Sequence, residues 1–557
     1  MRILPLGDAV LLAELGSKPD AATAATALRL ARTLIERHGT VLRAVVPSFC
    51  TVAVHFAPGG TPRAEQVEAW IREAEDKPSK SARPSPRTVV LPVCYGGKFG
   101  PDLPEVAEHT RMTTAQVIAQ HKSSIYDVRA IGFAPGFPYL GGLPGRLSTP
   151  RRKTPRTKVP AGSVAIGGNQ TGVYPLESPG GWQLIGRTPE RLFQPEHNPP
   201  VLLRAGDRVR FLPVTPEDFA RRAAVVDQEA ELAIAQAGGV VGKGPAMTVV
   251  APGLLTTVQD LGRPAMQEHG IPEGGAMDRL AARIGNLLVG NPESAAVLEC
   301  TLRGPVVRFA VDVEVAVTGA RVAGLPYGRP FVVPAGELLS LEPIEQGLRA
   351  YLAVNGGFEV NVILGSRSTL LRSGLPGLAG RALRAHDTVP LGLTSHPPAN
   401  PRGGRWFVST ASFLSPGPVV RIVRGPQADW FPPATWQAFQ SATYTLSAQS
   451  DRMGLRLSGP ILNRETDREM VSHGVAAGTI QVPPDGQPIV LMADRQTIGG
   501  YAQLANVITV DLPKLAQRAS GEPVRFELVT LAEARRLAAE RLHELARLRV
   551  ALRERLR

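Results

Sequence analysis

Three short motifs place an aspartate directly before an arginine, each close to glycines. They are Asp451–Arg452 in SDRMGLRLSGP, Asp494–Arg495 in MADRQTIGGY and Asp278–Arg279 in GGAMDRLA. A guanidinium group offers a planar fork of N–H donors, so such a pair can orient a carboxylate or an amide substrate. The same pair can instead close a turn as a structural ion pair. We predict that the catalytic candidates are Asp278, Asp451, Arg452, Asp494 and Arg495.

Two histidines could carry protons. His121 ends a predicted helix shortly before Tyr126, and His473 lies in the motif SHG. An imidazole can act as a general base near neutral pH, but a single histidine is more often a packed or surface residue. His121 therefore joins the catalytic candidates, with a packed role as its alternative, and the same alternative applies to His473.

The stretch GFAPGFPYLGGLPGR, residues 132–146, holds no catalytic acid, base or thiol. Its prolines exclude a helix and would remove hydrogen-bond donors from a regular strand, so we predict a shaped loop. Glycines let a backbone approach a ligand closely, and Phe133, Phe137 and Tyr139 would supply an apolar wall. The stretch is thus predicted to line a substrate site, with an interface between modules as the alternative.

A basic run, PRRKTPRTK at residues 150–158, follows that stretch. Its Arg151 and Arg152 could meet a phosphate or a carboxylate, or could simply belong to a solvated loop. We predict both arginines as substrate-binding residues. Gln481 and Tyr501, which flank the Asp494–Arg495 motif along the chain, are predicted to bind substrate as well.

The sequence lacks the motifs of several common enzyme and binding-site classes. GGVVGKG, residues 238–244, lacks the spacing and the Ser or Thr of a phosphate-binding loop, and we expect a flexible joint there. GxSxG, HExxH and GxGxxG motifs are missing. Cys50, Cys94 and Cys300 lie far apart, which supports neither a disulfide framework nor a zinc site. An enzyme of this sequence would use polar side chains in a cleft, or depend on other subunits.

Composition narrows the class of protein further. The net charge is +13, yet aromatic residues are only 5% and no basic block resembles a nucleic-acid tail. Asp8 and Glu14 interrupt the N-terminal apolar residues, and no apolar run is long enough to span a bilayer. We expect a soluble cytoplasmic protein that binds neither nucleic acid nor membrane. The 57 glycines and 51 prolines favour a mainly β fold.

Strand and helix patterns divide the chain into successive units. Strands are predicted at 9–15, 50–56 and 88–95, helices at 27–39, 64–76 and 217–237, and a single helix at 113–123 before the glycine-rich stretch. The predicted units are an α+β domain at 1–76, a Pro/Ser/basic linker at 77–87, a β domain at 88–214, a helical joiner at 215–246, a third unit at 247–530 and a basic helix at 531–557. The leucines of the last helix, 545, 548, 552 and 556, share one face, so it is expected to pack on the body or on a partner.

Internal repetition indicates β-barrels. AGSVAIGGNQTGVYPLESPGGW, residues 161–182, is similar to AGTIQVPPDGQPIVLMADRQTIGGY, residues 477–501. A closing pattern recurs as GDRVRF, residues 206–211, and GEPVRF, residues 521–526, with GELLSL at 336–341 as a weaker third copy. A pattern that returns with its turns intact predicts repeated barrel units.

These motifs together resemble two families that follow one another along the chain. HKSSIYDVRAIGFAPGFPYLGGLP, the stretch from PRRKTPRTK to QLIGRTP, and AGDRVRF resemble the KipI family, also called allophanate hydrolase subunit 1 or the B subunit of 5-oxoprolinase. PGLLTTVQDLGR, GGAMDRLAARIGN, NGGFEVNVILGSRSTL, VRGPQADWF, SDRMGLRLSGP and IQVPPDGQPIVLMADRQTIGGY resemble the KipA family, also called the C subunit of 5-oxoprolinase, a biotin-dependent carboxyltransferase domain family. We refer to the two regions as the B part and the C part.

The resemblance implies both a fold and a reaction. It implies a small N-terminal α+β domain, one cyclophilin-like β-barrel in the B part and two barrels in the C part. It implies an ATP-dependent 5-oxoprolinase that opens 5-oxoproline to glutamate together with a separate A subunit, and it leaves a homo-oligomer open. Two alternatives are the carboxyltransferase of a urea carboxylase or urea amidolyase system, which would involve biotin, and a KipI-like inhibitor of a histidine kinase.

The sequence departs from the usual family pattern at three places. Leu375-Pro376 and His386 stand where small residues or glycine are usual, Ala502-Gln503 replaces Pro-Lys, and SHG replaces a more acidic turn. These departures concern the substrate more than the fold, and the resemblance assigns no catalytic residue.

Overall fold

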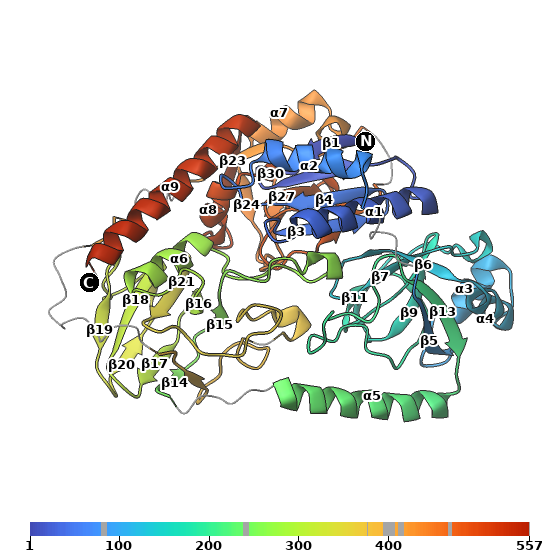
Figure 1. Ribbon diagram of the computed structural model, residues 1–557, viewed down its shortest axis with the longest axis horizontal. Helices are drawn as coiled ribbons and strands as arrows, with labels where there is room; N and C mark the ends of the chain where they lie inside the picture. The colour runs from blue at the N-terminus through green and yellow to red at the C-terminus, as the bar shows by residue number, and fades with distance from the viewer. Residues whose placement is uncertain are drawn as a thin grey trace.

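The computed structural model describes residues 1–79, 86–237, 244–375, 377–393, 407–409, 417–465 and 470–555. Most of the predicted linker 77–87, most of the joint at 238–244, Pro376 and Leu556 lie outside the described residues. The chain folds into β-rich units that surround a central junction, with one long helix, α5, along one side and another, α9, along the opposite side (Figure 1).

The N-terminal unit is a four-stranded antiparallel sheet covered by two helices. In sheet order its strands are β1 (Arg2–Pro5), β2 (Val10–Glu14), β4 (Thr51–His55) and β3 (Ala44–Ser48). Helix α1 (Ala21–His38) begins where the Asp20 carboxylate accepts the Thr23 N–H at 2.8 Å, and α2 (Ala64–Asp76) matches the predicted helix 64–76. Leu30, Leu34 and Ile71 on these helices are buried against the sheet, which gives the unit its own core.

A closed barrel of seven strands, the B barrel, forms the rest of the B part. In ring order they are β5 (Thr88–Tyr95), β12 (Gln183–Arg187), β9 (Ser163–Gly167), β10 (Gln170–Val173), β7 (Pro138–Gly141), β6 (Tyr126–Ile131) and β13 (Arg208–Pro213). A separate two-stranded antiparallel sheet pairs β8 (Arg156–Val159) with β11 (Ser178–Gly180). One residue pair, Ser48 with Ala130, joins the N-terminal sheet to this barrel.

The sequence predicts a single helix before the glycine-rich stretch, but the structure has two. Helix α4 (Thr114–Ser123) corresponds to the prediction, whereas α3 (Leu103–Thr110) was missed. Prolines at 101 and 104 flank or lie within the start of α3 and obscure its helical pattern. However, Pro104 lies in the first turn, where a missing N–H costs no hydrogen bond, and Arg111 ends the helix in a left-handed conformation with φ 56°.

The glycine-rich stretch is not wholly a loop, because β7 (Pro138–Gly141) lies inside it. Its strand is flanked by β6 and β10. Proline is tolerated as the first residue of a strand, and the three residues after Pro138 retain their donors. The loop prediction holds for residues 132–137 and 142–144, and a short 3-10 helix, η1 (Gly145–Leu147), begins at the end of the stretch.

The first unit of the C part consists of two sheets where a barrel was expected. One sheet contains β20 (Leu338–Ser340), β17 (Val306–Phe309), β14 (Ala246–Ala251) and β22 (Thr388–Pro390). The other contains β15 (Leu255–Gln259), β16 (Val297–Thr301), β21 (Ile344–Val354), β18 (Val313–Val322) and β19 (Phe331–Val333). Apolar side chains of both sheets share one core, so the unit is a sandwich. Helix α6 (Arg279–Leu288) packs on the outer face of the second sheet.

The second unit of the C part is a closed seven-stranded barrel, the C barrel. In ring order its strands are β23 (Val419–Arg424), β30 (Ala502–Val507), β27 (Thr479–Val482), β28 (Ile489–Leu491), β25 (Gly454–Ser458), β24 (Tyr444–Leu446) and β31 (Pro523–Leu528). The repeated patterns GDRVRF and GEPVRF form β13 and β31, and each pairs in parallel with the first strand of its barrel. The mainly β class and the repeat are thereby confirmed.

Two long helices connect and cover the units. Helix α5 (Pro216–Ala237) leads from the B barrel toward the C part, and α9 (Leu531–Arg555) begins beside the C barrel and the N-terminal unit and runs from there to the sandwich (Figure 1). Leu545 and Leu552 of α9 are buried against α6, and Arg535 donates to Glu65 of α2 at 2.9 Å. The last helix therefore packs on the body of the protein. No helix in the described part of the chain is long and apolar enough to cross a membrane.

Candidate functional site

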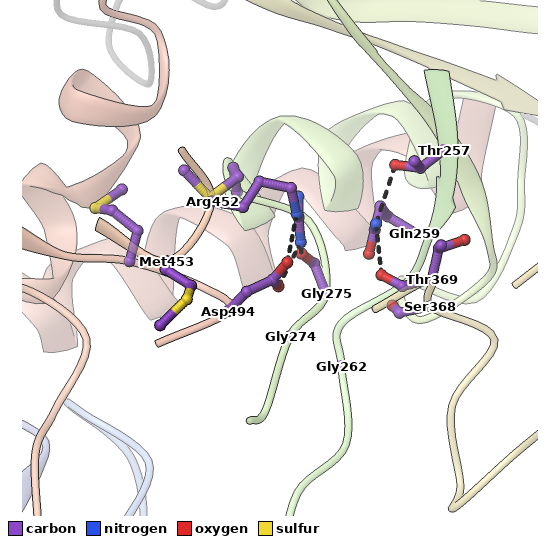
Figure 2. Close-up of polar contacts among 12 residues, drawn as sticks. Thr257, Gln259, Gly262, Gly274, Gly275, Ser368, Thr369, Arg452, Met453 and Asp494 are labelled. Carbon is purple, nitrogen blue, oxygen red and sulfur yellow. Dashed lines mark hydrogen bonds and ion pairs between the residues drawn. The ribbon is translucent and has the colours of Figure 1, made fainter. Parts of the chain in front are cut away.

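Two of the three Asp–Arg motifs meet in one buried ion pair. Arg452 donates to both carboxylate oxygens of Asp494 at 2.9 Å and to the carbonyl oxygen of Gly275 at 2.6 Å (Figure 2). Arg452 and Asp494 are 7% exposed. The bidentate geometry is the strong form of this interaction, and it ties the C barrel to the sandwich loop at Gly275.

A carboxylate that the sequence did not single out completes this pair. Glu299 on β16 accepts from Arg452 and from the Tyr351 hydroxyl, the latter at 2.8 Å. Burial would raise the pKa of Glu299, but the guanidinium groups of Arg452 and Arg349 lower it, so the carboxylate stays ionised. Burial would lower the pKa of Arg452, yet Asp494 and Glu299 together raise it. The cluster is a buried structural ion network.

Asp278 borders this network but serves a helix. Its carboxylate accepts the Ala281 N–H at 2.9 Å, which caps α6, and also accepts from Gln517 at 2.9 Å. Burial raises the pKa of Asp278 to about 6. Its own N–H donates to the Tyr351 hydroxyl at 2.8 Å, which links the cap to Glu299. Both carboxylate oxygens thus have partners within the fold.

Asp451 lies apart from the other candidates. Its carboxylate accepts the Met453 N–H at 2.8 Å and forms an ion pair with Arg372 at 2.8 Å, with nearly half of the side chain exposed. This is the turn-closing role that the sequence left open as the alternative. Arg452 and Asp451, although adjacent, therefore have separate surroundings.

A second polar cluster lies beside the Arg452 pair and was not predicted. Gln259 donates to the Thr257 hydroxyl at 3.0 Å and to the Thr369 carbonyl at 3.1 Å (Figure 2). Arg263 in the next loop is fully buried and donates to the Ser368 carbonyl, while its Nε and Nη1 lack protein partners. Burial lowers the pKa of Arg263 to about 10. Gln259 and Arg263 belong to the motif VQDLGR, and Ser368 and Thr369 belong to GSRST. The cluster was missed because it forms only where these two distant loops meet.

A cavity of about 270 Å³, the junction cavity, lies between the N-terminal unit, the C part and α9. The Asp494–Arg495 motif also contributes here, because Arg495 lines the cavity while its neighbour Asp494 turns away to Arg452. The ionisable residues on its walls are Asp8, Arg43, His55, Glu273, Arg279, Arg283, Arg495 and Arg541. The two halves of the chain therefore build this cavity together.

The electrostatics of the junction cavity favour an anion. Arg43 and Arg279 both bind the Glu273 carboxylate. Burial would raise the pKa of Glu273, but Arg279, Arg43 and Arg495 hold it well below the usual range. His55 is kept neutral, since burial and the nearby Arg495 lower its pKa to about 3. Three guanidinium groups thus surround one carboxylate.

The structure places His121 in the core of the B barrel, away from the junction cavity. It is fully buried, with Nδ1 2.8 Å from the Tyr95 hydroxyl and Nε2 3.1 Å from the Thr171 hydroxyl. Thr171 donates its own proton to the Ala165 carbonyl at 2.9 Å, so Nε2 carries the imidazole proton and Nδ1 accepts from Tyr95. Burial lowers the pKa of His121 to about 3. The packed role is the one that this geometry supports.

The aromatic residues of the glycine-rich stretch pack against their own barrel. The Phe137 ring lies edge-on to Tyr139 at 5.0 Å, to Tyr174 at 5.3 Å and to Trp182 at 5.7 Å, and Phe137 is buried. Phe133, at φ 67°, borders the same cluster. None of the three predicted wall residues lines the junction cavity.

The backbone of that stretch contacts the C part. Gly136 donates to the His269 carbonyl at 2.9 Å. A side chain at Gly132 would meet Ile498 at 2.8 Å, and one at Gly270 would meet the Ala134 carbonyl at 2.5 Å. These close approaches require glycine and support the interface alternative over the substrate wall.

The two arginines of the run 150–158 that were predicted to bind substrate have structural partners. Arg152 donates to Asp102 at 3.1 Å and to Glu105 at 3.3 Å. The Arg151 guanidinium lies 5.8 Å from the centre of the Trp182 ring, within cation–π range. Both residues stabilise the B barrel, and neither lines the junction cavity.

Gln481 and Tyr501 lie on the C barrel in contrasting environments. Gln481 is buried and its amide nitrogen has no partner, whereas nearly half of Tyr501 is exposed. Gln503, which replaces the usual lysine, contacts His473 at 3.3 Å, and burial lowers the pKa of that histidine. The amides and His473 form a buried polar cluster near the Ser48–Ser472 contact with the N-terminal unit.

Comparison with known proteins identifies the two halves. Residues 1–203 match the family "Carboxyltransferase domain, subdomain C and D", and residues 269–528 match "Carboxyltransferase domain, subdomain A and B". The chain is 41% identical to the 5-oxoprolinase C subunit of Escherichia coli K12 over 52% of this chain and 93% of the relative. It is 43% identical to the 5-oxoprolinase B subunit of Bacillus subtilis over 31% of this chain and 76% of the relative. The chain belongs to the family of 5-oxoprolinase B and C subunits.

The fused B–C arrangement has a counterpart among solved structures. The crystal structure of TTHA0988 superposes with a TM-score of 0.78 at 33% identity and covers 93% of this chain and 99% of that one. A more distant relative, urea amidolyase of Lachancea kluyveri, is 30% identical over 52% of this chain but only 17% of its own length. The matched C part ends at residue 528, so the family match does not extend into α9.

Proposed function

We propose that this chain is the B–C component of an ATP-dependent 5-oxoprolinase and works with a separate A-type subunit. The observation that carries the proposal is the match, in one chain and in order, to proteins named as the B and the C subunits of 5-oxoprolinase. Both parts also contribute walls to one cationic cavity, which supports a joint rather than a separate role.

The proposed reaction needs more than a binding site. A lactam amide is a poor electrophile, and phosphorylation of its oxygen would create a better one. In the junction cavity the residues of this chain would hold and orient the 5-oxoproline carboxylate through guanidinium donors and would keep the lactam ring out of bulk water. The chain by itself is expected to be inactive.

Neither of two prominent pockets in the described part of the chain suits ATP. The junction cavity, at about 270 Å³, lies below the roughly 300–1,000 Å³ of pockets for larger ligands. A wider surface groove over α7 (Pro433–Ser441) measures about 750 Å³, but its arginine, Arg424, is paired with Asp429 at 3.0 Å, and Glu465 adds another negative charge. We therefore assign the nucleotide to the partner subunit.

The test combines this chain with a purified A-type 5-oxoprolinase subunit, ATP and 5-oxoproline. The expected result is glutamate and ADP in equal amounts, with neither formed when either protein is left out. Absence of both products from the complete mixture would contradict the proposal. The cavity variants described below would then separate substrate binding from assembly.

The similarity to urea amidolyase supports a second candidate, a carboxyltransferase that acts on carboxybiotin. It predicts transfer of CO₂ from carboxybiotin to urea by this chain, with no requirement for an A-type subunit. Assaying both reactions with the same protein preparation distinguishes the candidates. A KipI-like inhibitor would show neither reaction and would instead bind a histidine kinase.

A further inference from the structure

Helix α9 supplies a wall of the junction cavity. Ala538, Arg541, Leu542 and Leu545 line it from one side. The helix is held there by close packing, since a side chain at Gly59 would meet the Ala539 nitrogen at 2.4 Å, and by an ion pair between Arg549 and Glu293. The cavity is thus closed by a segment that follows the matched C part.

Arg495 has no ion-pair partner among the described residues. Only 5% of it is exposed, and Nη1 makes a long hydrogen bond of 3.5 Å to the Met492 carbonyl. Its buried Nε has no hydrogen-bond partner. A buried guanidinium that forms no close ion pair and leaves Nε without a hydrogen bond is costly, so an anion in the cavity would stabilise it.

The acidic residues near Arg495 on the cavity wall are bound by other residues. Glu273 is occupied by Arg43 and Arg279. Asp8, also on the cavity wall, accepts two hydrogen bonds from Thr509, at 2.8 Å from the hydroxyl and 3.1 Å from the N–H. Much of the remaining wall is apolar, with Met277, Met492 and Leu542 among its residues. The cavity therefore combines one guanidinium that forms no direct ion pair with the described residues and an apolar interior.

We propose that the junction cavity is a binding site for a small carboxylate, with Arg495 as its anchor and α9 as its wall. The volume of about 270 Å³ suits a compact metabolite. A planar carboxylate matches the guanidinium fork, and an apolar ring or chain matches the remaining walls. The identity of the carboxylate as 5-oxoproline rests on the proposed function, whereas carboxylate binding does not.

The experiment measures binding of 5-oxoproline, L-glutamate and 2-pyrrolidone to the full chain by calorimetry. Because 2-pyrrolidone is the same lactam without the carboxylate, it should bind at least about 10-fold more weakly than 5-oxoproline. Arg495→Gln should weaken carboxylate binding roughly 10- to 100-fold, and Arg495→Lys should weaken it less, because it keeps the charge but loses the fork. Circular dichroism checks that each variant is folded.

A second pair of variants tests the α9 wall without touching Arg495. Leu542→Glu places a negative charge at the cavity and should weaken carboxylate binding roughly 5-fold or more. Val550→Glu adds the same charge to the same helix at a residue that is 59% exposed and outside the cavity lining, so it should bind like the wild type. Equal effects of the two variants would overturn the role of α9.

The outcomes separate this inference from the proposed function. Carboxylate binding that depends on Arg495, with no turnover in the presence of an A-type subunit, supports the site and rejects the 5-oxoprolinase assignment. Turnover with an unchanged KM in a folded Arg495→Gln variant supports the assignment and overturns the site. Equal binding of 5-oxoproline and 2-pyrrolidone, or no binding of either carboxylate, also overturns it.

Discussion

The B barrel and the C barrel have the same order of strands around the ring, but they differ in the residues just before the third strand, in chain order, of each barrel. We call the loop before that strand the corner of the barrel. From the first strand of each, the rings run β5-β12-β9-β10-β7-β6-β13 and β23-β30-β27-β28-β25-β24-β31. The strands occupy equivalent places in chain order and in the ring. In the B barrel the corner before β7 carries Phe133 and Phe137, whereas the corner before β25 carries Asp451 and Arg452.

This difference changes what each barrel can bind. The aromatic corner packs inward on Trp182 of its own barrel. The charged corner reaches outward, and Arg452 binds Glu299 of the neighbouring sandwich. The aromatic residues just before β12 and β30 differ in the same sense, since Trp182 is 5% exposed and Tyr501 is 45% exposed. A shared frame of hydrogen-bonded strands thus tolerates corners of opposite chemistry.

Removal of the positive charge from the charged corner of the C barrel should have the largest effect on stability. Arg452→Met leaves both Asp494 and Glu299 buried without their cation, so the free energy of unfolding of the C part should fall by about 5 kcal/mol, the upper end for a broken buried pair. Hydrogen exchange measured by mass spectrometry would show faster exchange in β27 than in β9.

Arg452→Lys is the matched control for that change. It keeps the charge but cannot make the bidentate contact, so its loss should be smaller. A loss below about 1 kcal/mol in Arg452→Met would contradict the view that the charged corner stabilises the C part.

Truncation of the aromatic corner should have the next largest effect. Phe137→Ala removes a fully packed ring, and the B barrel should lose about 3 kcal/mol of unfolding free energy. Because the ring packs within its own barrel, affinity of the folded variant for 5-oxoproline should change little. Chemical denaturation and calorimetry measure the two quantities, and Phe133→Ala, at a partly exposed residue, is the milder control. Lost affinity with unchanged stability would restore the substrate-wall interpretation.

Acidification should have the smallest of these effects, and it should change the stability of the B part and of the C part in opposite directions. The pKa of His121 is lowered to about 3 in the fold, below its unfolded value of about 6.5. The B barrel therefore has its full stability above pH 6.5 and loses it as the pH falls toward 3, by about 2 kcal/mol at pH 5. Burial raises the pKa of Asp278 to about 6, so its contribution to the C part is lost as the pH rises through 6.

Denaturation of the B part at pH 5 and pH 7 measures this difference. His121→Gln should remove most of the pH dependence of the B barrel and leave that of the C part in place. Equal pH dependence in the variant and the wild type would show that His121 does not titrate in this range.

Periodicity and the repeat predicted most of this fold. Helix 64–76 and strand 88–95 were predicted at their observed bounds because each has a clean apolar pattern between polar breaks. Helix α3 and strand β7 were missed because proline usually breaks such elements, although both prolines lie near the start of their element, where no donor is needed. His386, which departs from the small residues or glycine expected there, has φ 71°, a backbone conformation that glycine favours.

The candidate site was less predictable, because burial decides the role of each charge. Asp451, Asp494 and Arg495 belong to similar motifs, yet they form a surface turn, a buried ion pair and a cavity wall. Glu299 is 153 residues from Arg452 in the chain. No local pattern indicates that contact, and only the packing of the sandwich against the barrel brings the two residues together.

Helix α5 tethers the B barrel to the C part and thereby affects how readily the two parts come together. Its 22 residues, at about 1.5 Å each, span about 33 Å as a stiff spacer between the B barrel and the C part. Two such parts on separate chains must meet by diffusion, whereas here their encounter is intramolecular, with an effective concentration set by the tether. A weakened contact at the junction, such as loss of the Ser48–Ser472 hydrogen bond, should therefore separate the two parts less readily than it would separate two free proteins.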